Sequence, residues 1–174
     1  EWQFMSRPSV PSRVLPELVS FLETLAEPHI LCDREYRVIA ANVAYRANFS
    51  TGRSVVGRAC YEVSHHYSVP CDQAGETCPL ARSLKSGQRE RVLHLHHTPR
   101  GEEYVNIELS PVRDGEGAIA WFIEKMEPMH VARGLSDHRG LVGRAPAFQS
   151  MLELVARAAP SDASILLQGE SGTG

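Results

Sequence analysis

The chain has 174 residues, of which 43% are hydrophobic and 22% are charged, and its formal net charge is −3. This composition is typical of a soluble globular protein and excludes a disordered or fibrous chain. The small negative charge gives no general electrostatic reason to bind nucleic acid or an anionic membrane surface. No apolar run is as long as a transmembrane helix, and the first ten residues lack the pattern of a secretory signal. We therefore expect a cytoplasmic protein with no membrane contact.

The first elements are predicted by helical and strand periodicity. Residues 1–13 show no usable pattern and are interpreted as a terminus that is disordered or derived from an expression vector. Residues 14–27 are predicted to form a short amphipathic helix that Pro28 ends. Two short strands are then predicted on either side of the turn DREY, and Asn42 is placed to cap a helix with the sequence VAYRANF.

The next elements are bounded by proline and glycine. The segment PLARSLKS has Pro79 at its first position and Gly87 just beyond its end, which predicts a short helix. Turn residues then separate three apolar runs, which predict an antiparallel meander: RVLHLHH, EYVNIELSPV and AIAWFIEKM. The predicted fold class is therefore α+β, with one five-stranded antiparallel sheet.

This order of elements resembles a PAS domain, and three segments carry the resemblance: DREYRVIAAN, VVGRACYEV and AIAWFIEKMEP. The resemblance implies a PAS sensor domain over residues 28–127, with short helices on one face of the sheet. It also implies a homodimer through this domain and the N-terminal helix. Five apolar residues are expected on the inner face of the sheet, where they could wall a ligand cavity: Ile107, Leu109, Ile119, Trp121 and Ile123.

Residues 141–174 contain a predicted helix, a predicted strand SILLQ and a glycine-rich loop. The loop residues are Gly169, Glu170, Ser171, Gly172, Thr173 and Gly174. The stretch closely resembles the start of the AAA+ ATPase domain of sigma-54-dependent transcriptional activators, which implies that the loop begins an ATP phosphate-binding loop. Because the sequence ends where the lysine of that loop would follow, we do not expect this chain to hydrolyse ATP.

The same resemblance implies the partners of a longer regulator. That regulator would be an ATPase that acts on sigma-54 RNA polymerase and binds promoter DNA, whereas this chain would not bind nucleic acid directly. Residues 128–140 are interpreted as a partly helical linker between the two domains, with a disordered tether as the alternative.

A cluster of cysteine and histidine lies in CYEVSHHYSVPCDQAGETCPL, from Cys60 to Leu80. Zinc and iron prefer thiolate and imidazole ligands, so the predicted metal ligands are Cys60, His65, Cys71 and Cys78, with His66 as an alternative to His65. Cys78 precedes the first residue of a predicted helix, where unpaired N–H groups favour a thiolate. Some PAS domains joined to sigma-54 activators carry a similar pattern. The choice between zinc and an iron–sulfur cluster stays open.

Other interpretations of these residues remain. Cys71 and Cys78 could form a thiol–disulfide redox module, zinc could merely hold together a dimerisation domain, or the cysteines could be inert core residues. Cys32 is interpreted as a core residue. His94 and His96 share one face of a strand and are interpreted as solvated rather than as a second metal site.

These observations predict a sensing and dimerising PAS domain that controls a downstream AAA+ ATPase and is not itself an enzyme. The signal would be received by the Cys/His centre or by a cavity ligand.

Overall fold

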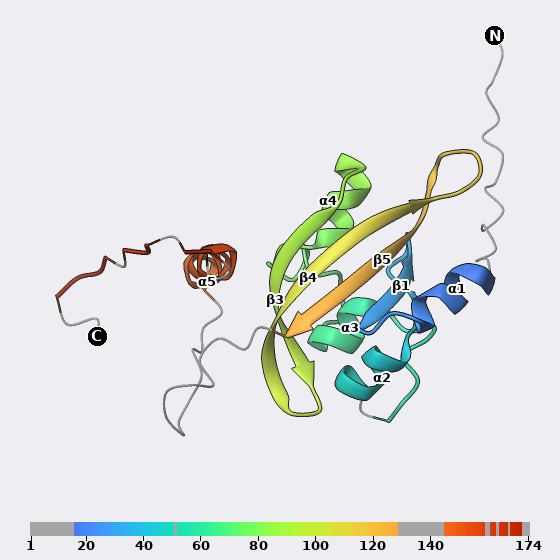
Figure 1. Ribbon diagram of the computed structural model, residues 1–174, viewed down its shortest axis with the longest axis horizontal. Helices are drawn as coiled ribbons and strands as arrows, with labels where there is room; N and C mark the ends of the chain where they lie inside the picture. Colours follow the sequence, from blue (N-terminus) through green and yellow to red (C-terminus); the bar gives the residue numbers. More distant parts are fainter. Residues whose placement is uncertain are drawn as a thin grey trace, which may run out of the picture. The chain divides into compact units, whose positions relative to one another are not determined.

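The computed structural model describes residues 16–50, 52–128, 145–158, 161–162, 164–166 and 168–171. The chain divides into two compact units, residues 1–128 and residues 129–174 (Figure 1). In the described ranges there is no helix that is both long and apolar enough to cross a membrane.

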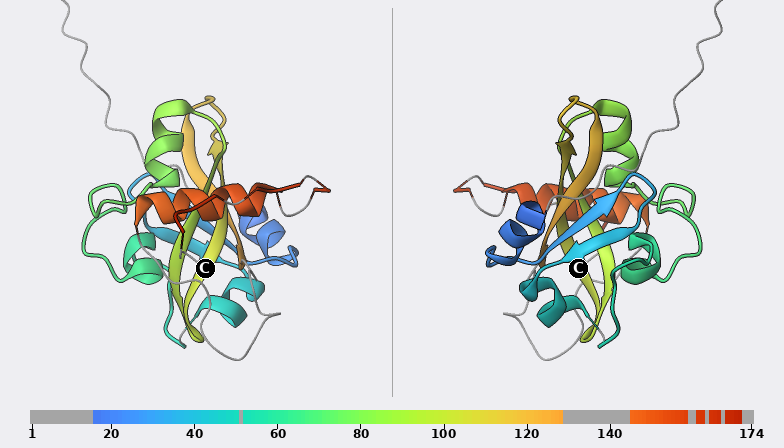
Figure 2. Two further views of the ribbon diagram at one scale, coloured as in Figure 1. Left: turned by 90° about the vertical axis from the view of Figure 1, so that its left-hand side faces the viewer. Right: turned by 90° about the vertical axis from the view of Figure 1, so that its right-hand side faces the viewer.

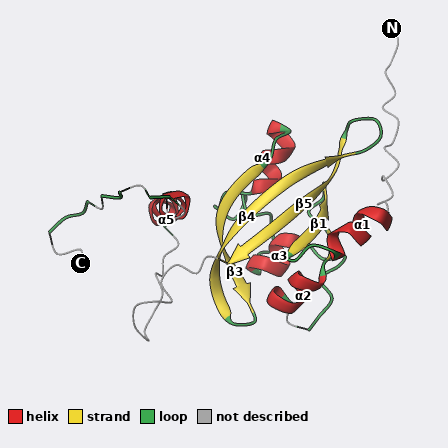
Figure 3. Ribbon diagram, in the orientation of Figure 1, coloured by secondary structure: helices red, strands yellow, loops and turns green. Residues whose placement is uncertain are grey.

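One antiparallel sheet forms the centre of the first unit (Figure 3). Its strands are β1 (His29–Asp33), β2 (Val38–Ala41), β3 (Glu90–Thr98), β4 (Gly101–Arg113) and β5 (Ile119–Pro128). The spatial order is β2-β1-β5-β4-β3, so the last strand in the sequence pairs with the first. The predicted fold class, hairpin and meander are confirmed.

The helices lie on both faces of this sheet. They are α1 (Pro16–Glu23), α2 (Val43–Phe49), α3 (Cys60–His65) and α4 (Pro79–Ser86). In the side views, α3 and α4 lie on one side of the sheet and α1 lies on the other (Figure 2). We call the side of α3 and α4 the inner face. Leu22 of α1 packs on the outer face against Leu31 and Trp121.

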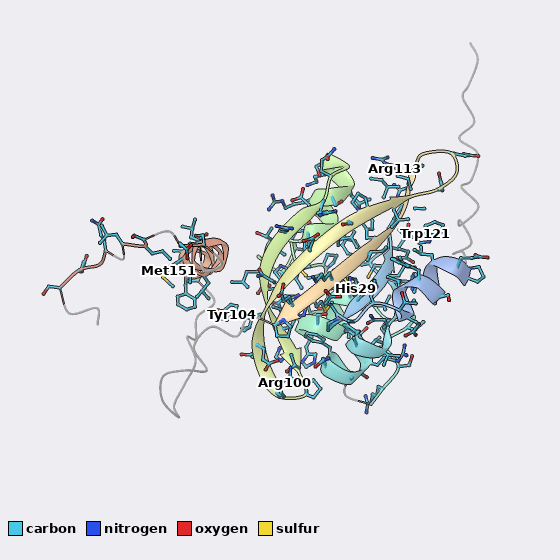
Figure 4. The ribbon with its side chains drawn as sticks, in the orientation of Figure 1. His29, Arg100, Tyr104, Arg113, Trp121 and Met151 are labelled. Atoms are coloured by element: carbon cyan, nitrogen blue, oxygen red, sulfur yellow. The ribbon has the colours of Figure 1, made fainter. Side chains whose placement is uncertain are left out.

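The prediction that Trp121 and Ile123 face inward is wrong, whereas Ile107, Leu109 and Ile119 do pack in the inner core. The cause is an irregularity in strand pairing, because Val112 pairs with Trp121 but the next residue, Arg113, pairs with Ile119. The extra residue reverses the alternation of side chains along β5. Trp121 therefore lies toward α1 (Figure 4), and Phe122 and Met126 face inward instead.

Asn42 connects three elements and confirms the predicted helix cap. Its Oδ1 accepts hydrogen bonds from the backbone N–H groups of Tyr45 and His29, each at 2.9 Å. Its Nδ2 donates to three carbonyls that follow or end α1: Leu22, Leu25 and Glu27, at 3.2, 3.1 and 2.8 Å. Because the Asn42 side chain is buried, it supplies these backbone groups with partners that water does not reach, although the Leu22 carbonyl also accepts from the Leu25 N–H at 3.2 Å.

The predicted boundaries of α4 are also confirmed. Pro79 is its first residue, and Gly87 ends it in the left-handed conformation with φ of 68°. The Gly87 N–H donates to the Ser83 carbonyl at 2.8 Å. A glycine is favoured there because other residues reach this conformation only with a steric penalty.

The second unit contains α5 (Pro146–Ala158), which agrees with the helix expected there. The strand predicted at 164–168 is wrong for its described residues, which adopt no regular structure. Strand formation requires hydrogen bonds from a neighbouring strand, and the described part of this unit offers none. The predicted linker lies almost entirely outside the described residues.

Replacing Asn42 tests its role as a connector. We expect Asn42→Ala to lower the free energy of unfolding by about 3 kcal/mol, because it removes a helix cap and leaves buried backbone groups unpaired. Chemical denaturation monitored by circular dichroism would measure the loss. The control is Asn48→Ala on the same helix, whose side chain donates one bond to the Ala44 carbonyl and should cost less than about 1 kcal/mol. Equal losses in both variants would contradict this role.

Candidate metal centre

A small cavity lies between the inner face of the sheet and the helices α3 and α4. The cavity volume is about 10 Å³, which is close to the volume that one bound water requires. Seven potential metal ligands line it: Cys60, Cys71, Cys78, His65, His94, His96 and Glu124. All four residues of the predicted metal set are therefore on the wall of one cavity.

These side chains come from five segments of the fold. The helix α3 carries Cys60 at its start and His65 at its end. Cys71 lies in the connection to α4, and Cys78 is the N-cap of α4. His94 and His96 lie on the edge strand β3, and Glu124 lies on the central strand β5.

Three of the side chains converge most closely. Within the described residues, His65, Cys71 and His94 form the one group whose potential ligand atoms all lie within 4.8 Å of one another. The His65 ring centroid is 4.8 Å from that of His94 and 4.7 Å from that of His96.

The prediction that His94 and His96 are solvated is wrong, since their exposed fractions are 4% and 2%. The two residues do share one face of β3, as the alternation predicted, but this face is covered by α3 and by the connection to α4. Alternation in the sequence HLHH identified the shared face without indicating which side of the sheet it would take.

Backbone carbonyls fix the orientation of two imidazoles. His65 Nδ1 donates to the Leu95 carbonyl at 3.1 Å, and His94 Nε2 donates to the Thr77 carbonyl. In each neutral ring the other nitrogen carries the lone pair, so Nε2 of His65 and Nδ1 of His94 are the atoms suited to a metal. This arrangement, with one ring nitrogen held by an outer acceptor, is usual for histidine ligands.

Burial keeps the rings of His65 and His96 neutral. It lowers the pKa of His65 to about 3 and that of His96 well below the usual value, and the neighbouring imidazoles add to both effects. The His65 Nδ1 atom lies 3.9 Å from Oε2 of Glu76, but this contact is not an ion pair at neutral pH because the ring is uncharged. A neutral imidazole is the form that binds metal ions.

Cys71 and Cys78 form a hydrogen-bonded thiol pair. The bond from Cys71 lowers the pKa of Cys78, and the N–H groups of Ala81 and Leu80 lower it further. The Ala81 N–H donates to Cys78 Sγ at 3.4 Å, so the predicted thiolate position at the start of α4 is present. The hydrogen bond to Cys78, together with burial, raises the pKa of Cys71.

Cys60 faces the same cavity but donates to a different thiol. Its hydrogen bond to Cys32, followed by burial, raises its pKa well above the usual value. Cys32 is fully buried in the inner core, which agrees with its interpretation as a core residue. All four cysteines are free thiols.

His66 does not join the group. It has a left-handed backbone with φ of 58° at the end of α3, and its ring stacks on His97 with centroids 4.1 Å apart. The change of backbone direction after His65 separates the two adjacent histidines. His66 lines a second cavity instead.

Glu124 was not identified in the sequence because a single acidic residue in a strand carries no motif. Its exposed fraction is 6%, and it lines the cavity with the thiols. Burial, with a smaller effect from the charge of Cys78, raises the pKa of Glu124 to about 8. The alternation of IAWFIEKM could have indicated which face of the sheet Glu124 takes. The irregular pairing near Trp121 shifts that alternation by one residue, so the sequence assigned Glu124 to the wrong face.

The loop residues Gly169, Glu170 and Ser171 are exposed and adopt no helix or strand. Gly172, Thr173 and Gly174 lie outside the described residues. The assignment of these six residues to an ATP phosphate-binding loop stays a prediction.

The raised pKa of Glu124 gives a pH-dependent prediction for protein treated with a chelator. Because the carboxyl is protonated in the folded state up to about pH 8 but ionises near 4.5 when unfolded, its stabilising contribution is lost as pH rises through this window. We expect Glu124→Gln to gain stability relative to wild type by up to about 1.4 kcal/mol per pH unit there. Denaturation at several pH values would measure the difference, with Glu127→Gln as the exposed control on the same strand. A difference that does not change with pH would contradict the buried acid.

Comparisons with known proteins assign the fold. A family model described as a PAS fold matches residues 22–126. Among solved structures, VqmA of Vibrio cholerae has a TM-score of 0.51 at 22% identity, covering 67% of this chain and 53% of VqmA. The LOV protein of Rhodobacter sphaeroides has a TM-score of 0.53 at 16% identity, covering 67% of each chain. At these identities, the structures support the fold alone.

Short matches connect the chain to transcriptional regulators. The transcriptional regulatory protein ZraR of Salmonella typhimurium is 51% identical over 35 residues, which are 20% of this chain and 8% of ZraR. The DNA-binding transcriptional regulator NtrC of Proteus hauseri is 36% identical over 59 residues, which are 34% of this chain and 12% of NtrC. The chain thus spans only a small part of these curated relatives. Because the PAS model matches more than half of its residues, the chain belongs to the family of PAS domains.

Proposed function

We propose that this chain is the sensory part of a sigma-54-dependent transcriptional regulator and that its PAS domain receives a signal through one buried metal ion. The observation that carries the metal proposal is the convergence of His65, Cys71 and His94 within 4.8 Å. Both imidazoles are oriented by backbone carbonyls, which leaves the other nitrogen of each ring for a metal.

Cys78 is the best fourth ligand. It contacts Cys71, and its lowered pKa favours the thiolate that a metal requires. The proposed set is therefore His65, Cys71, His94 and Cys78, which keeps three of the residues predicted from the sequence. Cys60 and Glu124 remain on the cavity wall, where they could complete a higher coordination number.

An unpaired carboxylate oxygen also supports a cation. Glu76 Oε1 accepts from the Tyr67 hydroxyl at 2.7 Å, whereas its buried Oε2 has no hydrogen-bond partner. Oε2 lies 3.9 Å from Nδ1 of His65. A metal on the opposite nitrogen of that ring would bring positive charge close to this carboxylate and would favour its ionised form.

The size of the cavity favours a single ion over a cluster. An open space of about 10 Å³ accommodates one ion, but an iron–sulfur cluster would also have to place its sulfides there. Two His and two Cys ligands suit zinc in a tetrahedral site, and iron would use the additional oxygen of Glu124.

The regulatory part of the proposal rests on the second unit. The matches to ZraR and NtrC and the resemblance of residues 141–174 to an AAA+ domain support a role in transcription. In the complete regulator, residues 169–174 would begin the ATP-binding loop, and sigma-54 RNA polymerase and promoter DNA would be its partners. Phe21 on α1 is 56% exposed and would contribute to a homodimer through α1 and the sheet.

The hydrogen bond between Cys71 and Cys78 supports a second candidate function, a thiol–disulfide redox module. The Cys78 thiolate would attack a substrate disulfide, and Cys71 would then displace the substrate as a second thiol while the Cys71–Cys78 disulfide forms. The two cysteines would be reactive in this case without any metal.

Metal content tests the first proposal. We expect anaerobically purified protein to contain about one equivalent of metal, and we expect His94→Gln to lower the affinity at least about tenfold. Elemental analysis and a chelator competition would measure both. His97→Gln on the same strand is the matched control, because His97 lies outside the ligand group. Full metal content in the His94 variant would reject His94 as a ligand, and no metal in the wild type would reject the centre.

Alkylation distinguishes the metal centre from the redox module. If Cys71 and Cys78 bind metal, we expect iodoacetamide to modify them slowly until a chelator is added, after which their modification should accelerate. Peptide mass spectrometry would follow each cysteine, with buried Cys32 as an internal reference. Rapid modification of Cys78 in untreated protein, together with turnover of a disulfide substrate, would support the redox module instead.

A further inference from the structure

A second cavity lies beside the metal centre and is lined by basic side chains. The volume of this cavity is about 270 Å³, far larger than that of the cavity at the metal centre. Arg53, Arg58, His66 and His97 contribute to its wall, together with the hydroxyl-bearing Thr98. We propose that this cavity binds a small organic anion, with one carboxylate or phosphate group on an apolar body.

The charges of the wall favour an anion. Arg53 forms no ion pair with any residue in the described ranges, so its guanidinium is available to a ligand. Arg58 bonds to Glu62 through Nε and Nη2, at 3.1 and 2.6 Å, which neutralises Glu62 and leaves other N–H groups of the guanidinium. Guanidinium groups bind carboxylates and phosphates with directed, charge-assisted hydrogen bonds.

Two acidic side chains contact residues of the wall without lining the cavity. Glu103 pairs with Arg100 at 2.9 Å and accepts from the Thr98 hydroxyl at 3.2 Å, and Glu102 lies 3.6 Å from Nε2 of His97. None of the lining residues is itself acidic. The cavity wall therefore carries basic groups without an acidic side chain of its own.

The remaining wall is apolar. Phe49 and Val55 are 5% and 6% exposed, and Val63 of α3 completes this side. A few polar groups on an otherwise apolar wall are typical of small-molecule sites. The apolar side chains would contact the body of a ligand whose anionic group faces the arginines. Inorganic phosphate has no such body and would not contact them.

Two stacked imidazoles form one side of the cavity. His66 ends α3 in a left-handed backbone conformation, and its ring lies parallel to that of His97, with an angle of 9° between the planes. Because His66 follows His65 and His97 follows His96, the two sites share backbone but present separate side chains.

Calorimetry with four probes tests the site in the 174-residue protein: benzoate, phenyl phosphate, neutral benzamide and inorganic phosphate. We expect benzoate or phenyl phosphate to bind at least about tenfold more tightly than benzamide and inorganic phosphate, because a charge-assisted bond and the apolar wall both contribute. Equal binding of charged and neutral probes would overturn the anion site. Equal binding of inorganic and phenyl phosphate would overturn the role of the apolar wall.

Variants locate the binding. Arg53→Gln should weaken the better anion at least about tenfold, and His97→Gln should weaken it without loss of metal. Arg89→Gln, which removes an exposed arginine paired with Glu108 at 2.9 Å, is the matched control and should leave binding unchanged. Unchanged binding in the Arg53 variant would overturn the assignment. This inference does not depend on the metal centre, since His94→Gln and His97→Gln separate the two sites.

Discussion

The constraint on which this structure depends is that buried donors and acceptors need partners. The inner face of the sheet, where a PAS domain places its core, contains three thiols, three imidazoles and a carboxyl around one small cavity. Some of them satisfy one another, as in the bonds of Cys71 with Cys78 and of Cys60 with Cys32. Others have lone pairs that a cation in the cavity would use. Burial of so many polar groups costs folding energy unless a ligand compensates for it.

Backbone groups around the cavity hold the potential metal ligands in fixed orientations. Leu95 and Thr77 provide carbonyls to the imidazoles, and the start of α4 provides N–H groups to a thiolate. These outer contacts come from segments whose conformation is set by other interactions. Strand pairing holds Leu95 opposite Tyr104, and Pro79 fixes the first residue of α4. The side chains are therefore oriented before any ligand binds, which reduces the cost of binding.

Local signals in the sequence were sufficient for most of the fold. Asn42 as a cap, Pro79 and Gly87 as helix boundaries, and the turns of the meander each act through neighbouring residues, so the sequence alone reveals them. The cysteine cluster likewise identified the region of the site. What the sequence did not reveal depends on tertiary structure. His94 joined His65 and Cys71 because α3 covers β3, and Trp121 faced outward because one extra residue in β5 reversed the alternation. Among the described residues of the second unit, the segment predicted as a strand at 164–168 has no partner strand, which no local pattern could indicate.

Cys78 also places one end of α4 at the cavity. This helix of eight residues is a rigid rod about 12 Å long. Its first end is fixed through the Cys78 sulfur at the cavity, and its last end contacts the β4–β5 turn, where Arg113 donates to the carbonyls of Gly87 and Gly117. A single eight-residue helix thus connects a cavity thiol with the turn from which β5 begins.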